Sequence, residues 1–229
     1  MRHEQEVSLG VRTTVAAVGA PGLLVPFGMI AALVVGRSGG LHAMDAHVTE
    51  RLHRLALDHP VLTDSMVWWS LVFSPNAWRA GALGLIVWLV KRRHARTAAF
   101  WVAATMTAGG VLGGVLKLLF GRHRPDLLDP VARATGFSFP SGHALNCALG
   151  AVVFLLVLLP EVRERPLAKA ALWCAAIGVP LVTGFTRVAI GVHWTSDVVA
   201  GWLLGVAVPA VTVVIFHSRM ARVRERVTG

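Results

Sequence analysis

Long apolar runs separated by short polar connections dominate the pattern of this chain. The runs cover residues 13–36, 76–90, 97–116, 144–159, 170–185 and 198–216. A transmembrane helix needs about 20 mainly apolar residues, so five runs suit a membrane span, and the run at 76–90 is a shorter candidate that carries Arg79 near its start. The pattern predicts an all-α fold, an integral membrane bundle of six transmembrane helices. We expect one membrane-embedded domain over residues 1–229.

The composition agrees with a membrane protein. Hydrophobic residues make up 55% of the chain and charged residues only 15%, whereas about 25% of the residues in a typical soluble domain are charged. The two cysteines, Cys147 and Cys174, both lie inside apolar runs. Their spacing suits neither a zinc site nor a disulfide framework. No stretch between the runs is long enough to fold as a separate soluble domain.

The distribution of charge predicts how the chain is oriented in the membrane. The formal net charge is +10, and much of the basic charge gathers in two connections and the C-terminal tail. The basic residues are Lys91, Arg92, Arg93 and Arg96, then Arg163, Arg165 and Lys169, and finally Arg219, Arg222, Arg224 and Arg226. Six helices threaded in order would bring all three places to one side, which is typical of the cytoplasmic side. We therefore expect a multi-pass protein of the plasma membrane with both termini in the cytoplasm and no nucleic-acid partner, whereas the oligomeric state stays open.

A polar stretch after the first run also shows helical periodicity. Within residues 44–58, Val48, Leu52, Leu55 and Ala56 recur at helical spacing. This pattern favours an amphipathic helix lying at the outer membrane interface. An ordinary helix in an extramembrane loop is an equally good interpretation.

Polar residues gather at the outer ends of three other runs. These ends read KLLFGRHRPD at 117–126, FPSGHALN at 139–146 and GVHWTSD at 191–197, with Arg187 just before the last one. Positive charge on the outer side runs against the usual bias of membrane proteins. Each basic residue alone also suits a helix end whose side chain reaches the interface. Taken together, the three edges predict one outer-facing site.

A bound phosphate group accounts for all three edges. Arg124 and Arg187 offer planar forks to phosphate oxygens, and Lys117 offers a point charge. Ser141 and Gly142 begin a helix, where free N–H groups and the positive end of the helix dipole favour an anion. Gly142 leaves room for phosphate to approach the backbone, and the Ser141 hydroxyl can donate a hydrogen bond.

Two histidines supply candidate chemistry. His193 and Asp197 are four residues apart, so we expect them on one face of the last helix. A carboxylate that accepts the N–H of one ring nitrogen leaves the other nitrogen bare as a nucleophile. His143 is then available to protonate the departing alkoxide as a general acid. Too few further ligands accompany these residues for a metal site, so the sequence predicts no metal and no other cofactor.

These residues resemble the three signature motifs of the phosphatidic acid phosphatase type 2 family of membrane lipid phosphatases. K-x6-R-P occupies residues 117–125, P-S-G-H occupies 140–143, and S-R-x5-H-x3-D occupies 186–197. Thr186 stands where the family usually has Ser. Because Thr keeps the hydroxyl, only the fine geometry of phosphate binding is in question. The resemblance extends from about residue 40 to 217, although only the motifs are specific.

The resemblance implies a role for each motif residue. His193 would form a phosphohistidine intermediate, Asp197 would orient it, and His143 would protonate the leaving group. Water would then release inorganic phosphate without a metal ion. The phosphate would be held by Lys117, Arg124, Ser141, Gly142 and Arg187.

We therefore expect a phosphatase acting on a lipid phosphate or diphosphate at the outer face of the membrane. Undecaprenyl or another polyprenyl diphosphate, phosphatidylglycerol phosphate and phosphatidate are all candidate substrates. A lipid phosphotransferase and a non-catalytic lipid-binding or transport relative stay open as alternatives. The soluble vanadium-dependent haloperoxidases share the same constellation, but the long apolar runs argue against that class.

Overall fold

The computed structural model describes residues 2–127, 131–132 and 134–228, apart from the side chains of residues 2–18, 220, 221 and 223–228. This part of the chain is helical and contains no β-strand, which confirms the all-α prediction. The elements are α1 (Arg2–Val35), α2 (Gly39–Asp58), α3 (Pro60–Val72), α4 (Pro75–Lys91), α5 (Arg96–Phe120), α6 (Gly142–Leu158), the short 3-10 helix η1 (Leu159–Val162), α7 (Pro166–Ala189) and α8 (Thr195–Thr228).

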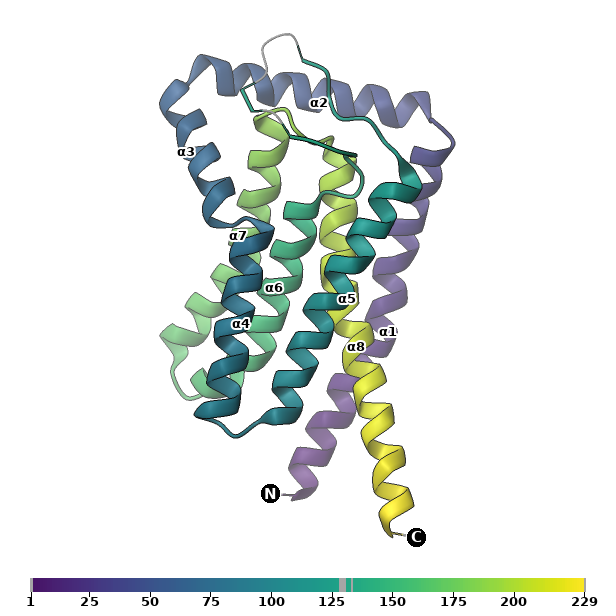
Figure 1. The fold of residues 1–229 in the computed structure, drawn as a ribbon, viewed down its shortest axis with the longest axis vertical. Coiled ribbons are helices and arrows are strands. Elements are labelled where there is room, and N and C mark those ends of the chain that lie inside the picture. The colour runs from purple at the N-terminus through teal and green to yellow at the C-terminus, as the bar shows by residue number, and fades with distance from the viewer. Residues whose placement is uncertain (1, 128–130, 133, 229) are drawn as a thin grey trace.

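Most of the long helices run side by side, and α2 lies across one end of the bundle (Figure 1). Ser38 caps the start of α2 by accepting a hydrogen bond from the Leu41 N–H at 3.4 Å. α2 turns by 99° from Gly19–Val35, the part of α1 whose side chains are described. The predicted helix at 44–58 is therefore present, and it begins earlier, at Gly39.

Helix α6 is the centre of the bundle and packs against α4, α5, α7 and α8. Its sequence, GHALNCALGAVVFLLVL, is small or apolar on nearly every side, so it can be buried all round. Glycines of α8 allow an especially close approach. A Cβ at Gly201 would lie 2.8 Å from the Ser141 carbonyl oxygen, and one at Gly205 would lie 2.6 Å from that of Leu145. This contact brings the beginning of α6 next to the beginning of α8.

Four helical segments of the described chain are long and apolar enough to cross a membrane. They are Arg96–Phe120, Gly142–Val162, Pro166–Ala189 and Thr195–Arg219. A fifth arises only if Gly19–Val35 and α2 count as one bent span. The helix α4 has 17 residues, which is short for a full crossing. The structure thus supports a helical membrane protein with four to five candidate spans, and the predicted number of six stays a prediction.

The two ends of the bundle differ in the residues that they carry. The turn between α4 and α5 and the segment around η1 lie at one end, together with the beginning of α1 and the end of α8 (Figure 1). These are the basic connections of the sequence. The three motif edges lie at the opposite end, under α2. The chain therefore separates its exposed basic connections from its motif residues by the length of the bundle.

Candidate active site

One cavity at the α2 end of the bundle brings the three motif edges together. Its volume is about 470 Å³. The residues that line it are Pro75, Lys117, Arg124, Ala134, Thr135, Gly142, His143, Arg187 and His193. Six of these are among the eight site residues predicted from the sequence. Ser141 and Asp197 lie behind the lining, and both are fully buried.

Lys117 reaches the cavity from the last turn of α5. Its Nζ donates to the carbonyl oxygens of Phe137, at 2.7 Å, and Ser138, at 3.4 Å. The helix ends at Gly121, whose φ of 56° is the left-handed conformation that glycine adopts readily. The chain then reverses, and the Ser138 N–H donates to the Arg122 carbonyl oxygen at 2.8 Å. The loop residues that follow α5 are thereby fixed over the start of α6.

Arg124 ties this loop to the segment before α8. Its Nη1 donates to the Val192 carbonyl oxygen at 2.6 Å, and its Nη2 donates to the Thr135 carbonyl oxygen at 3.1 Å. The same Nη1 lies 3.2 Å from Nε2 of His193. Since a guanidinium only donates hydrogen bonds, this contact favours an unprotonated Nε2. Nε2 is then the ring nitrogen that carries the lone pair.

Arg187 is a buried cation whose charge is incompletely matched. It lies in the last turn of α7, its residue is only 8% exposed, and it lines the cavity. Its Nε has no hydrogen-bond partner among the described residues. A buried charged donor without a partner is costly. An anion in the cavity would offset the charge of this guanidinium, and Lys117 and Arg124 add positive charge beside it.

His193 and Asp197 are paired, but the sequence-based prediction that they share a helical face is wrong. His193 precedes α8, which begins at Thr195. The Asp197 carboxylate reaches back from the first turn of α8 and accepts the Trp194 N–H at 2.9 Å, as an acidic side chain does in a capping box. The same oxygen lies 3.4 Å from Nδ1 of His193. The pair is therefore made by the helix start and the loop before it.

The surroundings of His193 hold its ring neutral. The residue is 2% exposed. Burial lowers the pKa of His193 well below its usual range, and the charges of Arg124, Arg187 and Lys117 lower it further. With Nδ1 beside a carboxylate and Nε2 beside a donor, the neutral ring carries its proton on Nδ1. This is the tautomer that an Nε2 nucleophile needs.

The start of α6 contributes His143, Gly142 and Ser141 in different ways. The side chain of His143 lines the cavity, whereas the Ser141 hydroxyl lies within 3.5 Å of the Ala144 N–H and caps the helix. The Ser141 N–H donates to the Asp197 carbonyl oxygen at 2.9 Å. A Cβ at Gly142 would lie 3.7 Å from Cε of Lys117, so glycine keeps this wall of the cavity open. Sequence reasoning placed Ser141 at the phosphate, and the structure places its hydroxyl at the helix cap.

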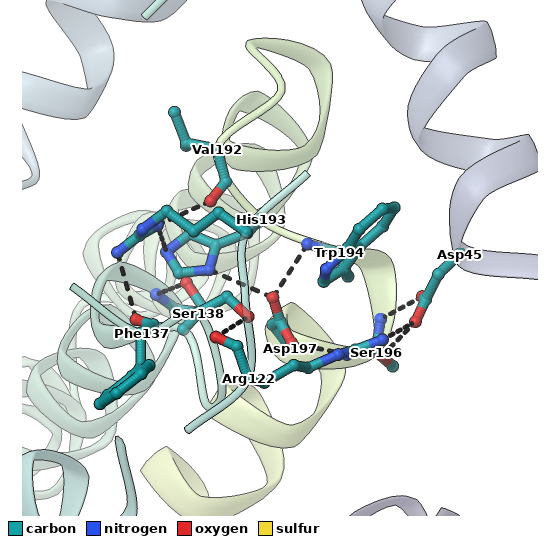
Figure 2. Close-up of polar contacts among 12 residues, drawn as sticks. Asp45, Arg122, Phe137, Ser138, Val192, His193, Trp194, Ser196 and Asp197 are labelled. Carbon is teal, nitrogen blue, oxygen red and sulfur yellow. Dashed lines mark hydrogen bonds and ion pairs between the residues drawn. The ribbon is translucent and has the colours of Figure 1, made fainter. Parts of the chain in front are cut away.

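The sequence-based site omits three residues that hold Asp197 from behind. Arg122 donates to Oδ1 of Asp197 at 2.7 Å, and it also contacts Asp45 of α2 and Ser196 (Figure 2). Arg122 lies in the first motif edge, two residues before Arg124. Its position in the sequence could therefore have indicated that it belongs to the site. Nothing in the sequence connected Asp45 to the site, because it lies in a polar helix far from the motifs along the chain.

Comparison with protein families supports the resemblance drawn from the motifs. The pattern of the PAP2 superfamily matches residues 98–221. The chain is 38% identical over 102 residues to an undecaprenyl-diphosphatase from Sulfolobus acidocaldarius, which covers 42% of this chain and 44% of that protein. It is 35% identical over 95 residues to phosphatidylglycerophosphatase B from Bacillus subtilis, covering 42% and 46%. It is 33% identical over 129 residues to a lipid A 1-phosphatase from Rhizobium johnstonii, covering 51% and 48%.

The chain spans a little under half the length of these three relatives. Two crystal structures share the fold. The PAP2-type phosphatidylglycerolphosphate phosphatase from Bacillus subtilis superposes with a TM-score of 0.70 at 24% identity, over 84% of this chain and 93% of that one. LpxE from Aquifex aeolicus superposes with a TM-score of 0.55 at 22% identity, over 73% and 93%. Because the family pattern covers more than half of the chain and includes all three motifs, this protein belongs to the PAP2 superfamily.

Proposed function

We propose that this protein is a membrane lipid phosphatase that works through a phosphohistidine intermediate without a metal ion. The observation that carries the proposal is the pairing of an anion site with a nucleophile. Arg187 and His193 line the same cavity, and the buried Nε of Arg187 has no hydrogen-bond partner among the described residues. The names of the matched relatives, all phosphatases of lipids or of a polyprenyl diphosphate, support the same reaction class.

Positive charge in the cavity suits a phosphate that carries two or more negative charges. Lys117, Arg124 and Arg187 line it, and cations held in a shielded site neutralise the charge that builds up on the transferring phosphoryl group. The free N–H groups at the start of α6, with Gly142 at the wall, add donors without adding bulk. These groups take the part that a metal ion plays in other phosphatases.

The reaction then proceeds in two displacements. Nε2 of His193 attacks phosphorus, a P–N bond forms, and the P–O bond to the lipid breaks. His143 gives its proton to the departing oxygen, while the Asp197 carboxylate beside Nδ1 stabilises the positive ring. A water molecule next attacks the phosphohistidine and passes its proton to His143. The P–N bond breaks, and inorganic phosphate leaves with both histidines restored.

The same proposal includes a six-span topology with the cavity at the outer face of the plasma membrane. The separation of the exposed basic connections from the motif end supports this orientation. Single cysteines at His47, on the exposed face of α2, and at Arg163, beside η1, would report it in a background without Cys147 and Cys174. A membrane-impermeant thiol reagent applied to intact cells should label position 47 alone. Labelling at 163 alone would reverse the orientation.

The deciding experiment is phosphate release by the purified protein from a panel of lipids. The panel contains undecaprenyl diphosphate, phosphatidylglycerol phosphate and phosphatidate in detergent, each assayed with and without a strong chelator. We expect release from at least one lipid, unchanged by the chelator and inhibited by vanadate. Transfer of phosphate to a lipid acceptor without release would identify a phosphotransferase. Folded protein that is inactive on the whole panel would contradict the proposal, and activity restored by Mg²⁺ would contradict its metal-free form.

A further inference from the structure

Two buried carboxylates share one guanidinium behind the active site (Figure 2). Nη1 of Arg122 lies 2.7 Å from Oδ1 of Asp197, and Nη2 lies 2.7 Å from Oδ2 of Asp45. Both carboxylate side chains are 0% exposed and the Arg122 side chain is 13% exposed. Ser196 completes the cluster, because its N–H and its hydroxyl both donate to Asp45, at 2.9 and 2.5 Å.

Asp197 is the one member of this cluster that takes part in the reaction proposed above. None of Asp45, Arg122 and Ser196 lines the cavity. Burying an ion pair costs desolvation energy, and such a pair often stabilises a protein no better than apolar residues of similar size. We therefore consider a role for this cluster other than stability. Its contact with Asp197 indicates that it acts on that carboxylate.

The two carboxylate oxygens of Asp197 have different partners. Oδ1 accepts from Arg122, and Oδ2 faces the Trp194 N–H and Nδ1 of His193. A charge-assisted hydrogen bond at 2.7 Å on one oxygen fixes the rotation of the carboxylate. The other oxygen is then aimed at the ring. Without Arg122, the carboxylate could turn about its terminal bond and leave Nδ1.

Asp45 gives the cluster the charge that the ring needs. A lone guanidinium at Arg122 would cancel the negative charge of Asp197, and Asp197 would stabilise a positive His193 ring poorly. With Asp45 included, one guanidinium and two carboxylates (+1 − 2) leave a net charge of −1. In a buried region with little screening, a net charge of −1 stabilises a positive His193 ring much better than a net charge of zero. Asp45 belongs to α2, so the helix across the end of the bundle acts on the nucleophile.

We propose that Arg122 and Asp45 are positioning residues for the His193–Asp197 pair. Arg122 aims the Asp197 carboxylate, and Asp45 offsets the charge of Arg122. The proposal rests on the proposed function and names two residues that serve it without touching phosphate. Its consequence is a loss in the rate of forming the phosphohistidine, with phosphate binding left intact.

The test compares Asp45→Asn, Arg122→Lys and Arg122→Met with the wild type, on a lipid phosphate and on nitrophenyl phosphate. We expect kcat to fall about tenfold in Asp45→Asn and about a hundredfold in Arg122→Met, which corresponds to about 1.4 kcal/mol for each tenfold step. Arg122→Lys should recover part of the loss. KM and the inhibition constant of vanadate should change by less than about threefold, because the cations of the cavity are untouched. Both substrates should suffer equally, since the leaving group is not involved.

A double variant and a matched control keep the test decisive if Arg122→Met folds poorly. Replacing both residues, Arg122→Met with Asp45→Asn, removes the uncompensated Asp45 carboxylate, and the double variant should lose less kcat than the product of the two single losses. Glu161→Gln breaks an exposed ion pair of the same 2.7 Å length at the other end of the bundle, and it should keep the wild-type kcat. Folded protein is counted by gel filtration, and kcat is expressed per folded molecule.

Two results would overturn the positioning role. One is a folded Asp45→Asn variant with wild-type kcat on both substrates. The other is a loss that disappears when kcat is expressed per folded molecule, which would make the cluster structural only. A failure of the proposed function would look different, because the wild type itself would then release no phosphate from any substrate.

Discussion

Ion pairs of equal length lie at both ends of the bundle, in opposite surroundings. At the basic end, Nη2 of Arg93 lies 2.7 Å from Oε1 of Glu161, with side chains 50% and 33% exposed. At the motif end, Arg122 and Asp197 are also 2.7 Å apart, with side chains 13% and 0% exposed. Water screens the first pair, which is worth little. The second pair acts in a shielded region, where charges affect one another strongly.

This difference indicates which charges of a membrane protein to examine for chemistry. Contact distance alone does not separate the two ends. Burial does so, together with a donor that has no hydrogen-bond partner among the residues that the structure describes, Nε of Arg187. At the basic end, we expect the charge to set the orientation in the membrane, so that one basic residue could replace another. At the motif end, the charged side chains are held by specific partners, so we expect single substitutions to have large effects.

The largest effect should come from His193→Ala. Without the nucleophile no phosphohistidine forms, so kcat should fall at least about 10⁴-fold on every substrate. The measurement is phosphate release from the best lipid and from nitrophenyl phosphate. His47→Ala, which removes an exposed histidine of α2, is the control and should keep wild-type activity. An active His193→Ala variant, with His143→Ala inactive on nitrophenyl phosphate, would exchange the roles of the two histidines.

His143→Ala should show an effect that depends on the leaving group. A lipid alkoxide needs a proton as it departs, so kcat/KM on a lipid monophosphate should fall about 10³-fold. Nitrophenolate is stable as an anion, and its ester should lose only about tenfold. A lipid diphosphate, whose leaving group is itself a phosphate, should fall between them. Equal losses on all three substrates would mean that His143 binds phosphate and does not donate a proton.

Arg187→Met should lower kcat/KM about a hundredfold, because it removes a cation that lines the cavity. Arg187→Lys should lose less, because it restores the charge but not the planar fork. Vanadate inhibition should weaken in parallel, since vanadate occupies the phosphate position. The same inhibition constant in Arg187→Met and the wild type would remove Arg187 from the anion site.

The smallest effect should come from Glu161→Gln at the basic end. Loss of an exposed ion pair costs about 0–1 kcal/mol of unfolding free energy, and no group of the cavity is disturbed. We expect kcat and KM within experimental error of the wild type. The comparison between the ends would fail if this variant lost as much activity as Asp45→Asn, and denaturant titration in detergent would then locate the cause.

Much of the site could be predicted from the sequence because the motifs are local and chemically specific. Lys117, Arg124, His143, Arg187 and His193 line one cavity, although they come from separate helix ends. Apolar runs that must cross a membrane in turn bring alternate ends to the same side. Polar residues at those ends are therefore confined to one end of the bundle, where they lie near one another. The meeting of the three edges was predictable for this reason from hydropathy and motif order alone.

Other features depended on tertiary packing. Arg122 and Arg124 are two residues apart, yet one turns to Asp45 and Asp197 and the other to the cavity. The left-handed turn at Gly121 and the hydrogen bonds that Ser138 donates to the Arg122 carbonyl oxygen set the path of this loop. That path directs the two arginine side chains to different sides. His193 lies in the loop before α8 because the Asp197 carboxylate caps that helix through the Trp194 N–H. A spacing of four residues alone could not distinguish that arrangement from a pair on a helical face.

The sequence by itself determined the all-α membrane class, the family and most of the residues that line the cavity, because hydropathy and motifs depend on the local order of residues. The tertiary structure alone decided which residues contact the cavity lining from the side away from the cavity. Asp45 reaches Arg122, and through it Asp197, only because α2 folds across the end of the bundle. Contacts between segments far apart in the chain depend on the packing of whole helices, and no local pattern encodes them.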